Sequence, residues 1–180
     1  IIQPGGTIIA FSGRILPEYA HEEGREVDAP KYRNSPESML YTKGKTLFGL
    51  HLAGQPMRRA NRAILVEGNV DVVAMHQRGY LETVAPLGTA LTAQQVALIA
   101  RFTESVVLCL DGDNAGRKAA RAAIPLLLDA GIEHPDDVLT RDAGRHPRFE
   151  LEPLTQLGPL ENVRVHDLEG APAVRLDVDR

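Results

Sequence analysis

The sequence predicts an α/β fold, in which helices flank a parallel sheet and a smaller basic α+β lobe comes first in the chain. Two short apolar runs, Ala63–Val66 and Val106–Leu110, are rich in β-branched residues, and each precedes a helical pattern. Glu67-Gly68 follows the first run, and Asp111-Gly112-Asp113 follows the second. Functional groups of such sheets collect where strands end and helices begin. We therefore expect these three carboxylates to meet at one edge of the sheet.

Length and composition are typical of a globular domain with an appended lobe. The chain has 180 residues, of which 43% are hydrophobic and 24% are charged. No stretch approaches the roughly 18 apolar residues of a membrane span, and no signal peptide opens the sequence. The lone Cys109 excludes an internal disulfide and a cysteine-based zinc cage, and is expected to be a small buried side chain. These features predict a cytoplasmic protein without membrane contact.

Charge is distributed unevenly along the chain. The net charge is −4, but residues 29–62 contain seven Lys/Arg and a single acid, Glu37. Residues 132–180 carry six basic and eleven acidic residues. A basic segment beside an acidic metal site is expected for a protein that handles phosphates, and a merely solvated positive face is the alternative. The basic residues of the segment are Lys31, Arg33, Lys43, Lys45, Arg58, Arg59 and Arg62.

The first 62 residues are expected to form short elements. Residues 1–16 predict a hairpin around the turn sequence Gln3-Pro4-Gly5-Gly6. Residues 17–30 are polar and Glu-rich, which is typical of a mobile loop. A helical pattern extends over 47–62, where Pro56 could introduce a break.

From Ala63 onward the sequence predicts alternating strands and helices with short connections. The strand 63–66 leads into a helix of about ten residues, with Val70, Val73 and Ala74 on one face. Thr83–Ala85 is a candidate short strand. This alternation is typical of a parallel α/β layer with right-handed crossovers.

The second half of the layer begins with a capping box. Thr92, with Gln95 three residues later, predicts the start of a helix that runs to about Phe102. After the strand 106–110, an Ala-rich helix is expected over 115–130 and ends at Gly131. Beyond it only a fragment of a further strand is recognisable, and the final segment alternates in a way that is typical of a β-hairpin.

Asp111 and Asp113 are suited to bind a cation. In extended backbone both side chains project to the same side, with Cα atoms about 7 Å apart. Mg²⁺ takes oxygen ligands in near-octahedral geometry and completes its shell with waters and substrate phosphates. Glu67, from the neighbouring strand end, would face the pair. The alternative is that Asp113 only caps the following helix while Asp111 lies in a turn.

Two segments resemble the motifs of Toprim domains. Val-Glu-Gly-Asn-Val-Asp at 66–71 is similar to the glutamate motif, and Asp-Gly-Asp-Asn-Ala-Gly-Arg at 111–117 is similar to the aspartate motif. Toprim domains occur in primases, type IA and II topoisomerases, nucleases and repair proteins, and these two motifs alone do not distinguish among them.

The flanking segments resemble bacterial replicative DNA primases of the DnaG type, over roughly residues 1–131. The resemblance implies a partial N-terminal lobe of the primase RNA polymerase domain at 1–62, a Toprim domain at 63–148 and an acidic tail at 149–180. The segments that carry it are Phe11-Ser12-Gly13-Arg14, Lys31-Tyr32-Arg33-Asn34-Ser35-Pro36-Glu37, Lys43-Gly44, Leu47-Phe48-Gly49-Leu50, Val72-Val73-Ala74 and Leu87-Gly88-Thr89-Ala90-Leu91-Thr92.

The resemblance implies a DNA-directed RNA polymerase that synthesises short RNA primers on single-stranded DNA. Its partners would be the template, ribonucleoside triphosphates and the replicative helicase, the last through a region absent from this chain. Asp111 and Asp113 would hold Mg²⁺ (or Mn²⁺), and Glu67 would ligate metal or assist proton transfer. Asp71 is a candidate further ligand, and an exposed helix acid is its alternative.

Basic residues and a third acidic cluster complete the implied site. Arg14, Lys31 and Lys43 match basic family positions that bind nucleotide phosphates or template, in keeping with their chemistry. Asn34 could contact substrate or simply belong to a turn. The family's third cluster resembles Asp-Pro-Asp, for which Asp136 is the candidate here, with a surface acid as its alternative.

Other functions stay open at this point. A different Toprim enzyme, such as a nuclease, would share the three acids, and a topoisomerase would need a nucleophilic tyrosine for which no candidate has a clear setting. A catalytically inactive fragment that binds nucleotide or nucleic acid is the non-enzyme alternative. The family's zinc-binding module needs a set of cysteines, and Cys109 is the single cysteine of these 180 residues.

Overall fold

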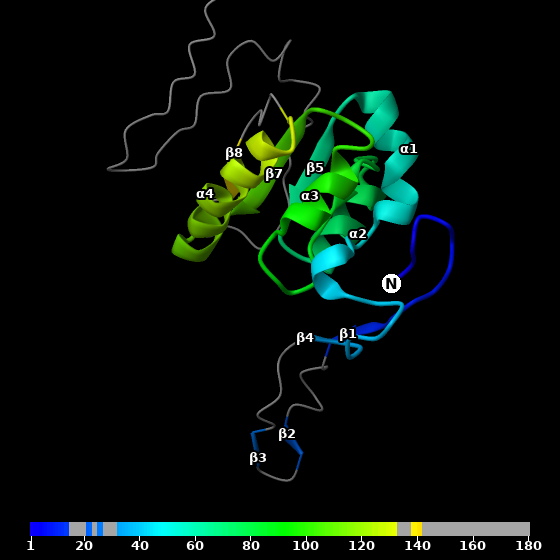
Figure 1. The fold of residues 1–180 in the computed structure, drawn as a ribbon. Helices are drawn as coiled ribbons and strands as arrows, with labels where there is room; N and C mark the ends of the chain where they lie inside the picture. Colours follow the sequence, from blue (N-terminus) through cyan, green and yellow to red (C-terminus); the bar gives the residue numbers. More distant parts are fainter. Residues whose placement is uncertain (15–20, 23–24, 27–31, 133–137, 142–180) are drawn as a thin grey trace, which may run out of the picture.

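A four-stranded parallel sheet forms the centre of the structure, which is a computed structural model (Figure 1). Its strands are β5 (Ala63–Val66), β6 (Thr83–Val84), β7 (Val106–Asp111) and β8 (Val138–Arg141), in the spatial order β6-β5-β7-β8. The chain leaves β5 toward β6 on one side, and leaves β7 toward β8 on the other. The direction in which the chain crosses the sheet therefore reverses between β5 and β7, and this boundary is the topological switch point of the sheet. The structure describes residues 1–14, 21–22, 25–26, 32–132 and 138–141.

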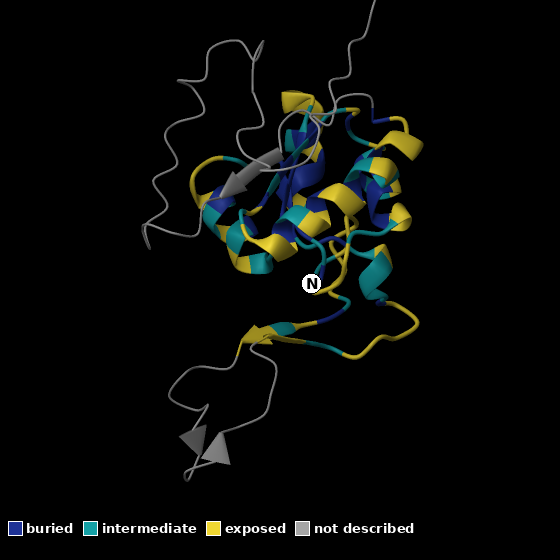
Figure 2. Cartoon of the chain, turned by 90° about the vertical axis from the view of Figure 1, so that its left-hand side faces the viewer, coloured by how far each residue is buried: buried dark blue, intermediate teal, exposed yellow. Residues whose placement is uncertain are grey.

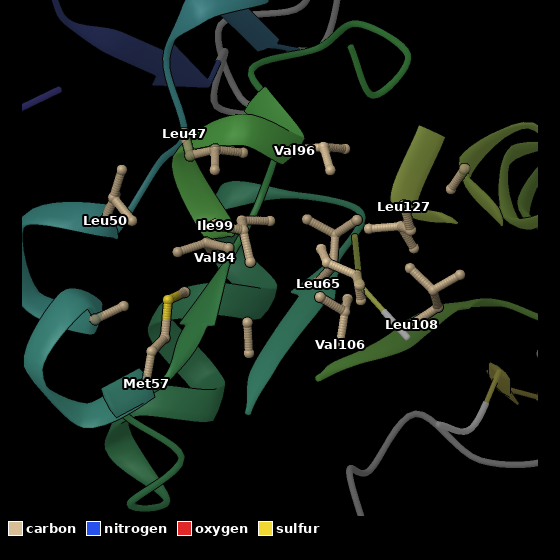
Figure 3. Close-up of a cluster of buried hydrophobic side chains, with 14 of the residues drawn as sticks. Leu47, Leu50, Met57, Leu65, Val84, Val96, Ile99, Val106, Leu108 and Leu127 are labelled. Carbon is tan, nitrogen blue, oxygen red and sulfur yellow. The ribbon is translucent and has the colours of Figure 1, made fainter. Parts of the chain in front are cut away.

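Helices cover both faces of this sheet. The helices α1 (Leu50–Ala60), α3 (Ala93–Ile99) and α4 (Asn114–Asp129) share one apolar cluster with Leu65 and Leu108 of the sheet (Figure 3). The helix α2 (Asn69–Gln77) packs on the opposite face, against Ile64 and Val66. Successive strand residues point to opposite faces, so β5 is buried on both sides and all four of its residues are apolar.

The N-terminal part forms small antiparallel elements beside this layer. β1 (Ser12–Arg14) pairs with β4 (Tyr32–Asn34), and β2 (His21–Glu22) pairs with β3 (Arg25–Glu26). We call the β1–β4 pair the ribbon; its residues are largely exposed (Figure 2). A 3₁₀ helix, η2 (Lys43–Lys45), follows it and leads into α1.

The predicted hairpin at the start of the chain is confirmed in a short form. Ile2 and Ile8 form an antiparallel bridge, and the N–H of Gly6 donates to the carbonyl of Gln3 within the turn. The predicted loop 17–30 is described only at β2 and β3, and the predicted tail hairpin at 149–180 lies outside the described residues. None of the helices in the described part of the chain is long and apolar enough to cross a membrane.

The expected adjacency of the strands 63–66 and 106–110 is confirmed, but three other predictions need correction. Pro56 does not break α1. Proline has no N–H to donate to the carbonyl of Leu52, four residues earlier, but Leu52 lies on the solvent side of the helix, where water can bond that carbonyl. In α2 the buried apolar side chains are Val72 and Met75, whereas Val70 and Val73 are exposed. A fourth strand, β8, completes the sheet where the sequence indicated only a fragment.

Candidate metal and phosphate site

The carboxyl ends of β5 and β7 bring two acidic side chains together. Val66 lies beside Cys109 in the parallel register, so Glu67 emerges next to Asp111, the last residue of β7. The carboxyl groups of Glu67 and Asp111 are within hydrogen-bonding reach of each other, and Asp113 is close enough for its charge to act on Glu67. This pair lies at the switch point of the sheet, where ligands of open α/β folds bind.

The proton affinity of Glu67 reflects this crowding. Although Glu67 is exposed, the protein atoms around it remove part of its hydration and so raise its pKa, and the hydrogen bond to Asp111 together with the charges of Asp111 and Asp113 raises it further. The backbone N–H of Asp111 acts in the opposite direction, because it donates to the Glu67 carboxylate. The edge therefore favours a bound proton or another positive charge between the two carboxyl groups.

The donor set suits a hard divalent cation, which prefers carboxylate oxygens. Within the described residues, no three acidic, His or Cys side chains are already arranged to enclose a metal ion. Glu67 and Asp111 are both exposed, so their side chains can adjust without disturbing the core. The chemistry thus fits a metal held between the two carboxyl groups, with open positions left for water or phosphate.

Asp113 has the capping role that its sequence position suggested, and its role as a metal ligand stays a prediction. It is the N-cap of α4, and its Oδ1 accepts a hydrogen bond of 2.8 Å from the N–H of Gly116. The turn is tightened by Arg117, whose guanidinium donates to the Gly112 carbonyl at 2.6 Å and to Asn114 Oδ1 at 2.7 Å. The cap leaves the second carboxylate oxygen of Asp113 without a bond in this turn.

Gly116 is a structural requirement that the local sequence pattern did not indicate. A Cβ at this position would overlap the Asp111 carbonyl and would lie 2.9 Å from its carbon and 3.0 Å from the Asp111 nitrogen. The first turn of α4 can approach the end of β7 only because residue 116 has no side chain. The Gly in the aspartate motif was the available signal.

Asp71 supports the glutamate turn from within α2. Its Oδ2 accepts a hydrogen bond of 3.0 Å from the N–H of Gly68, one residue after Glu67. Asp71 is half-buried, so it differs from the exposed helix acid that was the alternative. It lies beside the candidate site and fixes the backbone that presents Glu67.

The ribbon that carries Arg14 is attached near this edge of the sheet through its Ser12–Asn34 end. Asn69, the first residue of α2, donates to Ser12 Oγ at 3.0 Å, and Asn34 Nδ2 donates to the Leu87 carbonyl at 3.1 Å. Ser12 and Asn34 are cross-strand partners, so one pair anchors the ribbon to two loops at the carboxyl edge of the sheet. Arg14 is exposed, with its guanidinium 5.4 Å from the ring centroid of Tyr32.

Lys43 reaches the same edge by a different route. Phe48 forms an antiparallel bridge with Ala85, and Ala85 comes directly after β6. Residues that precede Phe48 therefore lie beyond the carboxyl end of β6, beside the end of β5 that leads to Glu67. Lys31 and Asp136 lie outside the described residues and stay predictions.

The basic segment is divided between two edges of the sheet, which corrects the expectation of one phosphate-facing segment. Arg62 comes directly before β5, at the opposite end from Glu67, and its guanidinium donates to Glu82 Oε1 through Nε at 2.9 Å and Nη2 at 2.7 Å. Arg58 stacks 5.1 Å from the ring centroid of Phe102. These two arginines support the fold, whereas Lys43 and Lys45 precede Phe48 and lie toward the acidic edge.

Two family models match the chain: "Toprim domain" over residues 61–134 and "DNA primase catalytic core, N-terminal domain" over residues 1–54. A DNA primase of Aquifex aeolicus is 46% identical over 133 residues, which cover 74% of this chain and 25% of the relative. A DNA primase of Neisseria meningitidis serogroup A is 41% identical, with 89% of this chain and 28% of the relative covered. The chain thus spans about a quarter of the length of these relatives.

Solved structures give the same result. The zinc-binding and RNA polymerase domains of the Aquifex aeolicus primase superpose with a TM-score of 0.71 at 43% identity, covering 79% of this chain and 33% of that one. The catalytic core of the E. coli primase superposes with a TM-score of 0.61 at 43% identity, covering 71% and 38%. A DnaG primase catalytic domain bound to single-stranded DNA also gives a TM-score of 0.61 at 43% identity, covering 71% and 38%.

Proposed function

Because the chain belongs to the DnaG-type DNA primases and covers part of their catalytic core, we propose that it forms the metal and nucleotide site of an enzyme that synthesises short RNA primers on single-stranded DNA. The observation that carries the proposal is the Glu67–Asp111 carboxyl pair at the switch point of the sheet. The match of residues 1–54 to a primase-specific family model favours this function over a Toprim nuclease or topoisomerase. We also propose residues 1–62 as part of the N-terminal lobe and 63–148 as the Toprim domain.

Toprim primases generally use divalent metal ions, and we propose Mg²⁺ or Mn²⁺ for this site. Glu67, Asp111 and Asp113 would hold the ion, with Asp71 and Asp136 as further candidates. A bound divalent ion supplies charge neutralisation for a triphosphate and for the developing charge at its α-phosphate.

The protein groups would bind and orient the reactants. The 3′-hydroxyl of a primer attacks the α-phosphate of a ribonucleotide, a new P–O bond forms and pyrophosphate leaves. Glu67 would either ligate the ion or accept the hydroxyl proton. Arg14, Lys31 and Lys43 would neutralise the triphosphate or the template backbone. Asn34 would act mainly through the Leu87 loop, because its amide nitrogen donates to the Leu87 carbonyl.

The proposed partners are a single-stranded DNA template and ribonucleoside triphosphates in the cytoplasm, and the replicative helicase through another part of the protein. A template-directed assay tests the activity in the full-length protein, with labelled ribonucleotides, a single-stranded template and Mg²⁺. Glu67→Gln and Asp111→Asn should each abolish primer synthesis, while Gln94→Met, an exposed change on α3, should leave it unaltered. Undiminished synthesis by both acid variants would refute the proposal.

A further inference from the structure

The buried carboxamide of Gln95 joins the start of α3 to the η2 turn. Gln95 has no exposed surface. Its Nε2 donates to two backbone carbonyls, those of Lys43 and Thr46, each at 2.8 Å. Its Oε1 accepts from the N–H of Thr92 at 3.1 Å. Both hydrogens of the amide and its oxygen are therefore used, as burial of a polar group requires.

Thr92 extends the same connection. Its hydroxyl donates to the Gly44 carbonyl at 2.5 Å and accepts from the N–H of Gln95 at 3.2 Å. Gly44 approaches closely, since a Cβ there would lie 3.4 Å from the Thr92 methyl group. Three backbone carbonyls of the turn, those of Lys43, Gly44 and Thr46, thus accept hydrogen bonds from two side chains of the α3 capping box. We call these three hydrogen bonds, with Thr92 and Gln95 as donors, the clamp.

The clamp links two parts of the proposed site. Thr92 ends the loop that follows β6, and the Lys43 turn lies beyond the carboxyl end of the same strand. An ordinary capping box needs only Thr92 and Gln95 bonded to each other. Here both capping-box bonds are present, and in addition the Gln95 amide hydrogens and the Thr92 hydroxyl donate to a segment about fifty residues earlier in the chain.

We propose that Gln95, assisted by Thr92, is a positioning residue that fixes the backbone of the η2 turn so that Lys43 is presented to a nucleic-acid or nucleotide phosphate. The inference rests on the proposed function, because it takes Lys43 as a phosphate-binding residue. If the turn were free to move, ordering it on binding would cost free energy, and the contact between Lys43 and a phosphate would be weaker. Gln95 itself carries no charge and touches no phosphate.

The salt dependence of single-stranded DNA binding separates positioning from simple support of the fold. Each phosphate neutralised by Lys or Arg adds about 0.7 to the slope of log affinity against log salt on single strands. Lys43→Met should lower this slope by about 0.7 and weaken binding roughly tenfold at low salt. Gln95→Met replaces one uncharged side chain with another, so it can lower the slope only through a charged neighbour.

The experiment measures fluorescence anisotropy of a labelled oligothymidylate with the full-length protein over a range of NaCl concentrations. Gln95→Met should lower the salt slope toward the Lys43→Met value, and adding Gln95→Met to Lys43→Met should cause no further loss. Gln94→Met is the matched control on the exposed side of α3 and should behave as the wild type. An unchanged slope in Gln95→Met, or an additive loss in the double variant, would overturn the inference.

A second pair of variants decides the matter if Gln95→Met does not fold. Thr92→Val removes the hydroxyl and should lower the slope, whereas Thr92→Ser keeps the hydroxyl and should restore it. If Lys43→Met weakens binding while the Thr92 and Gln95 variants keep the wild-type slope, the clamp is refuted and the proposed function stands. If Lys43→Met leaves affinity and slope unchanged, both the clamp and the role of Lys43 in the proposed function are refuted.

Discussion

The carboxyl groups of Glu67 and Asp111 lie within hydrogen-bonding reach at the ends of two adjacent parallel strands, β5 and β7. Parallel pairing places both strand ends at one edge, and the sheet order makes that edge the switch point. Two acids this close compete for ionisation, so the pair favours a proton or a cation between them. This relationship connects the fold to the proposed metal chemistry.

The stability of the metal-free protein should therefore depend on the ionisation of Glu67. The pKa of Glu67 is raised in the folded state, first by burial and then by Asp111 and Asp113. Folding thus favours the protonated form of Glu67. Its stabilising contribution is complete below the unfolded pKa and is lost as pH rises through the folded pKa. Urea denaturation of the wild type and of Glu67→Gln, in EDTA at several pH values, measures this contribution.

Glu67→Gln should gain stability relative to the wild type as pH rises through that range, because the amide never ionises. Adding saturating Mn²⁺ should reverse the trend in the wild type, since the metal stabilises the ionised carboxylates. A difference between wild type and Glu67→Gln that stays constant with pH would show that Glu67 titrates normally.

Gly116→Ala should damage both the fold and the site. The new methyl group would collide with the backbone of Asp111, which cannot move aside as a flexible side chain could. We expect a loss of about 2 kcal/mol or more in the free energy of unfolding, together with weaker metal binding. Gly5→Ala is the matched control, because nothing lies within 4 Å of a Cβ there. Equal stability of the two variants by chemical denaturation would contradict the close approach of α4 to β7.

Arg62→Met should destabilise the protein without affecting nucleotide binding. Glu82 is only 5% exposed, and removal of Arg62, which donates two hydrogen bonds to Glu82 Oε1, would leave a buried carboxylate unpaired. Because Arg62 is partly exposed, we expect a loss of about 2 kcal/mol rather than the larger cost of a fully buried pair. Thermal melts and ATP titrations of Arg62→Met check both parts. A loss of ATP affinity as large as that of Lys43→Met would contradict the division of the basic segment between two edges.

The sequence predicted the features that depend on short-range patterns. β5 and β7 were identified from compact apolar runs, and the Thr92–Gln95 capping box from a spacing of three residues, which the structure confirms. The meeting of Glu67 and Asp111 followed from a general property of parallel sheets, because neighbouring strands end at one edge.

Features set by tertiary contacts could not be predicted in this way. In α2, apolar residues occur on both faces, so periodicity did not identify Val72 and Met75 as the buried side. The Gln95 amide could be identified as a cap, but its bonds to Lys43 and Thr46 join segments about fifty residues apart. The pairing of Arg62 with Glu82 likewise appears only when β5 and β6, which these residues precede, are brought together.

Calorimetric titration of ATP and GTP into the protein, with Mn²⁺ or Mg²⁺ and again in EDTA, tests the central claim most directly. The wild type should bind nucleotide only when metal is present, and Asp111→Asn should lose this metal-dependent binding while remaining folded. Gln94→Met provides the control for nonspecific effects of substitution. Equal nucleotide affinity in metal and in EDTA, or full metal-dependent binding by Asp111→Asn, would contradict the assignment of the Glu67–Asp111 edge as the metal and nucleotide site.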